Sequence, residues 1–228
     1  MNKIIIANWK AHPDTLAEAQ ALFETETEAA AKYPNIKTVI CPPAEFVKEL
    51  GANGTQDIFW TAGGDNFGVQ YVLVGHSDRR YPPTGGGDTD EIINRKLKIA
   101  LNSGVTPILL IGEKTKGDNR QAVLGEQLNK NLANLITSQV VNILICYEPV
   151  WAISASPGAE PDKPENTLAA VEIIARLTGK KTILYGGSVN SANVGDFLKH
   201  SEISGAIVGQ ASLDAVQFEE VLKVVSAL

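Results

Sequence analysis

Eight short apolar runs, alternating with longer segments of helical periodicity, extend from one end of the chain to the other. This alternation is typical of repeated strand–helix units, and eight strands is the number that a closed parallel barrel needs. The runs are apolar almost throughout, as expected of strands that are covered on both faces. We therefore predict a (βα)8 barrel with strands at 3–7, 37–41, 58–62, 71–75, 106–111, 142–147, 181–186 and 205–209.

Five of the longer segments carry a clear helical pattern. One of them starts after Thr15, because Thr15 and Glu18 have the spacing of a capping box. In another, leucines recur every third or fourth residue from Leu124 to Leu135, which indicates one stripe that faces the core. We predict helices over 14–32, 88–102, 118–137, 164–178 and 214–227.

The connection between the third and fourth predicted strands is abnormally short. Only residues 63–70 separate them, whereas a crossover between parallel strands usually needs a dozen residues or more, with a helix inside. Either one strand assignment is wrong or the helix is missing or shortened. No linker divides the chain elsewhere, so we predict that residues 1–228 form a single barrel domain.

Composition excludes several classes of protein. The chain has 228 residues and a net charge of -6, so it lacks the basic surface that binders of nucleic acid or anionic membranes normally carry. Cys41 and Cys146 lie inside apolar runs and are expected to be buried free thiols. No apolar stretch approaches the ~20 residues that span a bilayer, and the N-terminus has no cleavage-site pattern. We expect a cytoplasmic protein with no nucleic-acid or membrane partner.

Polar residues that can do chemistry follow the predicted strands at one rim of the barrel. Lys10, His76 and Glu148 follow the first, fourth and sixth strands, and barrels of this type take their catalytic groups from the carboxyl ends of strands. Taken singly, the lysine could be a solvated surface charge and the histidine a satisfied core residue. Their shared rim favours an active site.

Two glycine-bearing segments follow the seventh and eighth strands. They contain Gly187 and Gly209, and these two strand ends are where such barrels build phosphate sites from bare backbone N–H groups. Because the protein is acidic as a whole, an anion must be attracted locally, and Lys10 supplies a positive charge there. We therefore predict a small phosphorylated substrate.

The chain resembles the triosephosphate isomerase family along nearly its whole length. Six segments occur in the family's order, NWK, GHSDRR, IGE, YEPVWAI, YGGSVN and VGQASL, and the order is more specific than any one of them. The resemblance implies a TIM barrel that interconverts dihydroxyacetone phosphate and D-glyceraldehyde 3-phosphate through an enediolate, in glycolysis and gluconeogenesis, without a cofactor.

The same resemblance implies roles for individual residues. Glu148 would be the catalytic base, His76 the electrophile and Lys10 a charged catalytic group, with Asn8 and Lys10 near the developing oxyanion. Contacts to the substrate and its phosphate would come from Asn8, Lys10, Ser154, Gly187, Ser188, Gly209 and Gln210.

The residues also suit this reaction on chemical grounds. Isomerisation through an enediolate needs a base for a carbon-bound proton and a donor for the oxygen that becomes negative. Glu148 ends a buried strand and precedes Pro149 and Trp151, so we expect dry surroundings that strengthen it as a base. Segment 149–163 exceeds an ordinary connection and is interpreted as a mobile lid that excludes water.

Some positions depart from the family's pattern. Ser154, Ala155 and Ser156 stand where the family usually has Gly-Thr-Gly, so the lid is expected to have less conformational freedom. Asp78 stands where glutamate is common and, one methylene shorter, could change how Lys10 is braced.

The short connection 63–70 is the largest departure. In the family, the loop after the third strand is long and inserts into a neighbouring subunit beside the lysine loop. We therefore predict a monomer or a homo-oligomer of non-standard architecture in place of the usual dimer. Looser support for Asn8 and Lys10, and hence reduced turnover, is a further prediction.

Two other functions stay open. A sugar-phosphate aldolase or epimerase on the same barrel needs a Schiff-base lysine on an inner strand or a metal cluster. The strand-end lysine is limited to Lys10, and His12, His76 and His200 do not form the pattern of a metal triad, so we expect no metal and no cofactor. A barrel that binds without catalysing is the second alternative, and the presence of Glu148, His76 and Lys10 together disfavours it.

Overall fold

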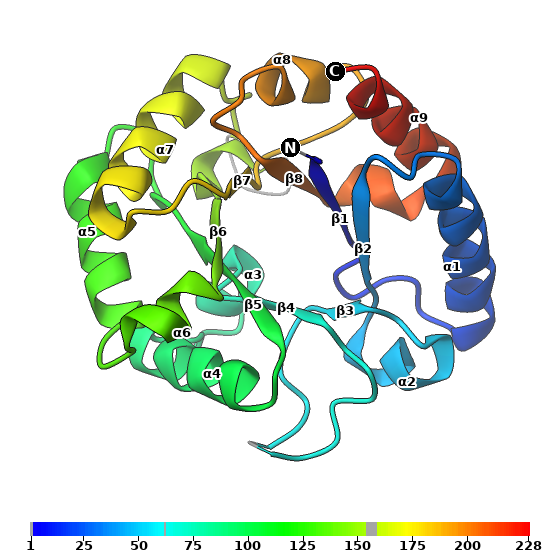
Figure 1. Cartoon of the computed structure of the whole chain (residues 1–228), viewed down its shortest axis with the longest axis horizontal. Coiled ribbons are helices and arrows are strands. Elements are labelled where there is room, and N and C mark those ends of the chain that lie inside the picture. The colour runs from blue at the N-terminus through cyan, green and yellow to red at the C-terminus, as the bar shows by residue number, and fades with distance from the viewer. Residues whose placement is uncertain (1, 62, 154–158) are drawn as a thin grey trace.

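Eight parallel strands surround a central axis, and helices form a ring outside them (Figure 1). The computed structural model describes residues 2–61, 63–153 and 159–228. Within these ranges the predicted barrel is confirmed, with strands β1 (Ile4–Asn8), β2 (Lys37–Cys41), β3 (Gly54–Thr55), β4 (Tyr71–Val74), β5 (Thr106–Ile111), β6 (Leu144–Tyr147), β7 (Ile183–Tyr185) and β8 (Gly205–Val208).

The helices follow the predicted segments, with one exception. The Thr15 cap is confirmed, because its hydroxyl accepts from the backbone N–H of Glu18 at 3.3 Å and donates to the Glu18 carboxylate at 2.7 Å. The predicted helix 118–137 is too long: it ends at Asn131, and a separate short helix begins at Thr137. The helices are α1 (Leu16–Ala31), α2 (Val47–Leu50), α3 (Ser77–Arg80), α4 (Asp90–Asn102), α5 (Arg120–Asn131), α6 (Thr137–Val141), α7 (Pro164–Thr178), α8 (Val194–Leu198) and α9 (Ala215–Ser226), with 3-10 turns η1 (Ala44–Phe46), η2 (Val150–Ala152) and η3 (Gln210–Leu213).

The position of the third predicted strand is wrong. Strand β3 is Gly54–Thr55, and residues 58–61 of the predicted strand 58–62 belong to the following loop. Gly54 is required there, because a Cβ at this position would lie 2.6 Å from Cys41 Sγ and 2.6 Å from Val39 Cγ1. The apolar residues of 58–61 pack in the loop instead of in a strand. Trp60 is buried there, and its indole N–H donates to Ser103 Oγ at 3.1 Å.

Both alternatives for the connection between the third and fourth strands apply: the strand assignment was wrong, and the helix is missing among the described residues. The connection comprises residues 56–70, and none of those described is helical. Figure 1 shows the consequence: the outer ring of helices is interrupted between α2 and α4, where this loop runs instead. The connection is longer than predicted because the strand before it ends earlier.

Side chains close the barrel between β2 and β3. The ladder of hydrogen-bonded strands runs in the order β2-β1-β8-β7-β6-β5-β4-β3, and no ladder joins its two ends. The Asn53 side chain bridges this seam, since its Oδ1 accepts from the backbone N–H of Ile40 at 3.1 Å and its Nδ2 donates to the carbonyl of Thr38 at 3.3 Å. On the other side, the Asn53 carbonyl accepts from the backbone N–H of Tyr71 at 3.0 Å.

The core has two parts, one inside the barrel and one between the strands and the helices. Along β1, Ile6 belongs to the inner part, while Ile5 and Ala7 belong to the outer part, as expected for alternating side chains of a strand covered on both faces. Cys41 and Cys146 are buried free thiols, as predicted, and burial raises the pKa of both well above the usual range. Neither is therefore a nucleophile at neutral pH.

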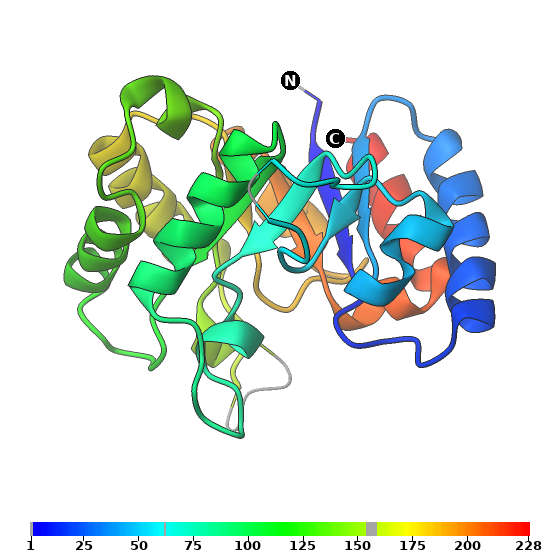
Figure 2. The same ribbon diagram turned by 90° about the horizontal axis from the view of Figure 1, so that it is seen from below.

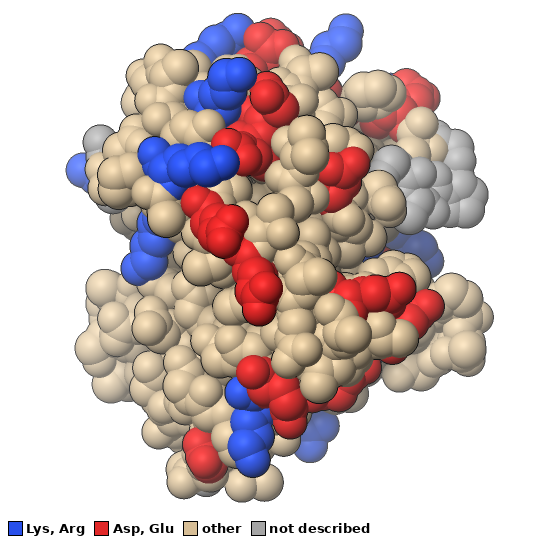
Figure 3. Space-filling model, turned by 90° about the vertical axis from the view of Figure 1, so that its right-hand side faces the viewer, with Lys and Arg blue, Asp and Glu red and all other residues tan. Residues whose placement is uncertain are grey.

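The functional end of the barrel is separated from the chain termini. Both termini lie at one end of the molecule, and α3 lies at the opposite end, after the carboxyl end of β4 (Figure 2). Acidic side chains extend across the face that carries α1 and α9, and Lys and Arg side chains gather at its upper left in Figure 3. No helix in the described ranges combines the length and the apolar character that crossing a bilayer requires.

We expect the Asn53→Ala substitution to lower the free energy of unfolding by about 1–3 kcal/mol, because it leaves backbone groups of Ile40 and Thr38 unpaired at the seam. The measurement is urea unfolding, with Asn129→Ala, at an exposed position of α5, as the matched control. Equal stability of the two variants would show that the seam does not need this side chain.

Candidate active site

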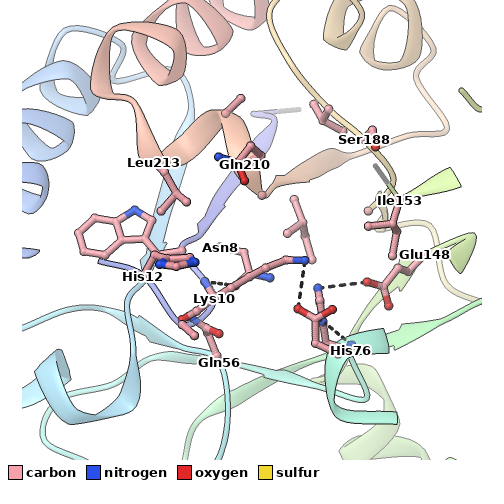
Figure 4. Close-up of a pocket in the computed structure, with 18 of the residues that line it drawn as sticks. Asn8, Lys10, His12, Gln56, His76, Glu148, Ile153, Ser188, Gln210 and Leu213 are labelled. Carbon is pink, nitrogen blue, oxygen red and sulfur yellow. Dashed lines mark hydrogen bonds and ion pairs between the residues drawn. The ribbon is translucent and has the colours of Figure 1, made fainter. Parts of the chain in front are cut away.

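A pocket of about 870 Å³ opens at the carboxyl ends of the strands. Its lining brings together every predicted site residue that the structure describes; Ser154 lies outside the described residues. Figure 4 shows Glu148 beside His76, Lys10 reaching toward them, and Ser188 and Gln210 on the wall across from His76. The predicted residues that line the pocket are Asn8, Lys10, His76, Glu148, Gly187, Ser188, Gly209 and Gln210.

Glu148 is a buried carboxylate held by donors from α3. It follows β6, and its backbone N–H donates to the carbonyl of Ile111 at 2.8 Å. Its Oε2 accepts from the backbone N–H of Ser77 at 2.9 Å, and its Oε1 accepts from the Ser77 hydroxyl at 3.1 Å. Burial raises the pKa of Glu148, and His76 and Ser77 oppose that effect. A raised pKa makes the carboxylate a stronger base once the donors exchange for substrate.

His76 is oriented as a proton donor toward Glu148. It caps the N-terminus of α3, where its Nδ1 accepts from the backbone N–H of Asp78 at 3.1 Å. A ring nitrogen that accepts a hydrogen bond carries no proton, so the proton lies on Nε2. Nε2 is 3.1 Å from Oε1 of Glu148. The imidazole therefore directs its N–H toward the base and into the pocket.

Lys10 reaches the pocket from a strained backbone conformation. Its φ is 58°, a region that L-residues with side chains seldom adopt. The backbone N–H of Lys10 donates to Asn8 Oδ1 at 3.2 Å, and its carbonyl accepts from the Gln56 side chain. The ammonium lies 3.0 Å from Asp78 Oδ2. Asp78 thus braces Lys10 although it is shorter than the family's usual glutamate.

Trp9, between Asn8 and Lys10, has a buried ionisable partner that the sequence analysis missed. Its indole is fully buried and donates to Glu26 Oε2 at 3.0 Å. Glu26 is 0% exposed on the inner face of α1. Burial raises the pKa of Glu26 to about 8, and the hydrogen bond from Trp9 opposes that effect. The sequence could have predicted that Glu26 is buried, because position 26 lies three residues after Phe23, on the stripe that the helical period places against the core.

Ser77 was also missed as a ligand of Glu148. The sequence shows it only as a small polar residue inside GHSDRR. Its partner lies 71 positions further along the chain, so no local pattern could have revealed the contact.

The far wall of the pocket combines backbone and small polar groups. Gly187 and Ser188 follow β7, and Gly209 and Gln210 follow β8. The Ser188 hydroxyl donates to the carbonyl of Ala152 at 2.9 Å, which links this wall to the start of segment 149–163. The predicted position of the glycine-bearing segments on the same rim as Glu148 is therefore confirmed.

The two described ends of segment 149–163 lie close together. The backbone N–H of Glu160 donates to the carbonyl of Trp151 at 3.4 Å. Lys116, after β5, contacts both ends. Its ammonium pairs with the Glu160 carboxylate and lies 5.6 Å from the centroid of the Trp151 ring.

A buried carboxylate and an imidazole in contact, with an ammonium in the same pocket, have the chemistry that moves a proton between neighbouring carbons of a small anionic carbonyl compound. The donor and the cation stabilise the negative oxygen that forms when the base removes the proton. The fold and the site together define a barrel enzyme of the isomerase class. Metal-ligating residues do not form a cluster of three or more in the described ranges.

The chain belongs to the triosephosphate isomerase family, because the model of that family, described as "Triosephosphate isomerase", matches residues 3–225. Similar relatives include the triosephosphate isomerases of Endomicrobium trichonymphae, 35% identical over 98% of this chain and 99% of the relative, and of Dictyoglomus thermophilum, 34% identical over 97% and 98%. That of Dictyoglomus turgidum is 35% identical over 97% and 98%. The family favours isomerisation over the aldolase, epimerase and non-catalytic alternatives.

Glu26 predicts a specific dependence of stability on pH. The folded protein keeps the Glu26 proton up to about pH 8, whereas the carboxyl of the unfolded chain loses it near its ordinary pKa of 4.5. The group's contribution to stability is therefore full below pH 4.5 and is lost as the pH rises toward 8. Glu26→Gln has no proton to lose at this position. We therefore expect the free energy of unfolding of the variant, relative to that of the wild type, to rise by about 1.4 kcal/mol per pH unit between pH 4.5 and 8.

The measurement is urea unfolding at several pH values, with Glu24→Gln on the exposed side of α1 as the control. Parallel stability curves for the wild type and Glu26→Gln would mean that Glu26 does not hold its proton in the folded state.

Proposed function

We propose that Glu148, His76 and Lys10 carry out the reaction of the family in this chain. The reaction is the interconversion of dihydroxyacetone phosphate and glyceraldehyde 3-phosphate, a step of glycolysis. The single observation that carries the assignment is the 3.1 Å contact between His76 Nε2 and Glu148 Oε1 inside the pocket that Lys10 enters. Asn8 is proposed as a substrate-binding group beside Lys10.

The proposed mechanism moves one proton between two carbons. Substrate replaces Ser77 at the Glu148 carboxylate, which takes the proton from the carbon next to the carbonyl and leaves an enediolate. His76 Nε2–H and the Lys10 ammonium stabilise the oxygen that becomes negative. In the enediolate, the proton of the hydroxyl oxygen moves to the former carbonyl oxygen through His76 Nε2, and the protonated Glu148 returns its proton to the neighbouring carbon. No atom is gained or lost, and no redox partner is needed.

The phosphate of the substrate is proposed to bind at the far wall. Gly187 and Gly209 leave their backbone N–H groups uncovered by side chains, and Ser188 and Gln210 add polar groups there. The assignment of Ser154 as a backbone donor, and that of segment 149–163 as a lid, remain predictions. Residues 154–158, the middle of that segment, lie outside the described residues.

We also propose that residues 1–228 act as a single domain in the cytoplasm, as a monomer or a non-standard homo-oligomer, without a nucleic-acid partner. The loop that replaces the missing helix supports this proposal, because its Asp57 carboxylate is paired within the chain. The Asp57 carboxylate pairs with Arg79 and lies 2.8 Å from the Lys96 ammonium, which also pairs with Asp88 at 2.6 Å. No charge of this cluster needs a neighbouring subunit.

We expect Glu148→Gln to lower kcat/KM by at least 10²–10⁴, because a carboxamide keeps the shape of the side chain but cannot accept the proton. The measurement is a coupled assay with glyceraldehyde 3-phosphate. Glu126→Gln, at an exposed position of α5, is the control and should retain wild-type activity. A Glu148→Gln variant within tenfold of the wild type would remove Glu148 from the role of base.

Light scattering tests the assembly. We expect the mass of one chain, 24.4 kDa, or a multiple of it other than two, over a wide range of protein concentrations. A particle of twice this mass that persists on dilution would contradict the monomer and return the usual family dimer to consideration.

A further inference from the structure

The buried carboxyl of Glu26 has no part in the mechanism above, and its position is costly. It is fully buried on α1, and its Oε1 has no hydrogen-bond partner among the described residues. Burying a carboxyl without satisfying both oxygens is unfavourable. A leucine at this position of the apolar stripe would avoid that cost. The side chain is therefore expected to serve something other than stability.

The partner of Glu26 is the residue that separates two substrate-binding positions. Trp9 lies between Asn8 and Lys10, and its indole N–H, which is buried, donates to Glu26 Oε2 at 3.0 Å. The indole also packs edge-on against Phe23, at 6.4 Å between ring centroids. Helix α1 thus holds the ring at two points, one polar and one apolar.

The position of Trp9 restricts the backbone of Lys10, because the two residues are adjacent and the Trp9 backbone is hydrogen-bonded on both sides. The Trp9 N–H donates to the carbonyl of Cys41 at 3.1 Å, and its carbonyl accepts from the His12 N–H at 3.1 Å. Lys10 follows with a φ of 58°. A left-handed conformation is disfavoured for an L-residue and persists only where its surroundings over-determine it. Release of the indole would let Lys10 relax to negative φ and withdraw its ammonium from the pocket.

We propose that Glu26 is a positioning residue, which holds the Lys10 ammonium in the pocket by accepting the hydrogen bond of the Trp9 indole. The inference rests on the proposed role of Lys10 in substrate binding. It assigns to a helix residue outside the pocket a part in the affinity for the anionic substrate.

The decisive variant is Glu26→Leu, which fills a similar volume, suits a helix and removes the acceptor. We expect kcat/KM to fall about tenfold, mainly through a higher KM, because Lys10 attracts the anion before as well as during the reaction. Resistance to urea at pH 8 should be equal to the wild type or greater. Glu26→Gln, whose amide oxygen still accepts from the indole, should keep kcat/KM within about threefold of the wild type.

Glu28→Leu is the matched control, because it makes the same change at an exposed position of α1, and it should leave both constants unchanged. Glu26→Met serves as a second apolar variant if leucine prevents folding. The indole ¹H–¹⁵N resonance of Trp9 should shift in both apolar variants and not in Glu28→Leu. Wild-type KM in a folded Glu26→Leu or Glu26→Met protein would overturn the proposal.

A double-mutant cycle with Lys10→Met separates this proposal from the proposed function. The probe is the dissociation constant of glycerol 3-phosphate, which carries the phosphate but no carbonyl to isomerise. Glu26→Leu should weaken its binding about tenfold in the wild type and have no further effect in Lys10→Met. Equal losses in both backgrounds would overturn the role of Glu26 alone. Unchanged binding in Lys10→Met would instead overturn the role of Lys10.

Discussion

Glu148 and His76 follow strands that are not consecutive in the chain, and they meet at 3.1 Å because parallel strands in a barrel all end at the same mouth. Strand β5 lies between β4 and β6, so the segments after β4 and β6 can converge over its end. The rest of the site depends on this arrangement. The Ser77 groups reach the Glu148 carboxylate from the first turn of α3, and the same turn supplies the Asp78 N–H that donates to Nδ1 of His76.

The connection between β3 and β4 has no helix among its described residues, and polar side chains hold this part of the barrel together. Asn53 bridges β2 and β3, and Gln56, three residues later, donates to the carbonyls of Lys10 and Cys41. Asp57 ties the loop to α3 and α4 through ion pairs. The same short stretch therefore seals the barrel, supports the lysine and pairs charges that would otherwise face solvent.

Glu148 and Glu26 are buried carboxyl groups, and both have a raised pKa for the same reason. Burial penalises the charged form of Glu148 and of Glu26. Glu148 has donors for both oxygens and faces the pocket, whereas Glu26 has one donor and faces the core. The first placement suits the role of base that is proposed for Glu148, and the second makes Glu26 an acceptor for a buried indole. Buried carboxyl groups that lower stability are typical of functional sites, where function and stability favour different residues.

The sequence by itself determined the class of fold, most element positions and the three groups proposed for proton transfer. Apolar runs report burial, helical periodicity reports a buried face, and Lys10, His76 and Glu148 follow strands whose direction is common to all. Only the tertiary structure decided where β3 lies, that Ser77 holds Glu148, and that Glu26 meets Trp9. A two-residue strand has no periodicity, and the apolar run beside it could be buried equally well under a loop. Local patterns record how much of a residue is buried, but its partner is selected by contacts between segments far apart in the chain.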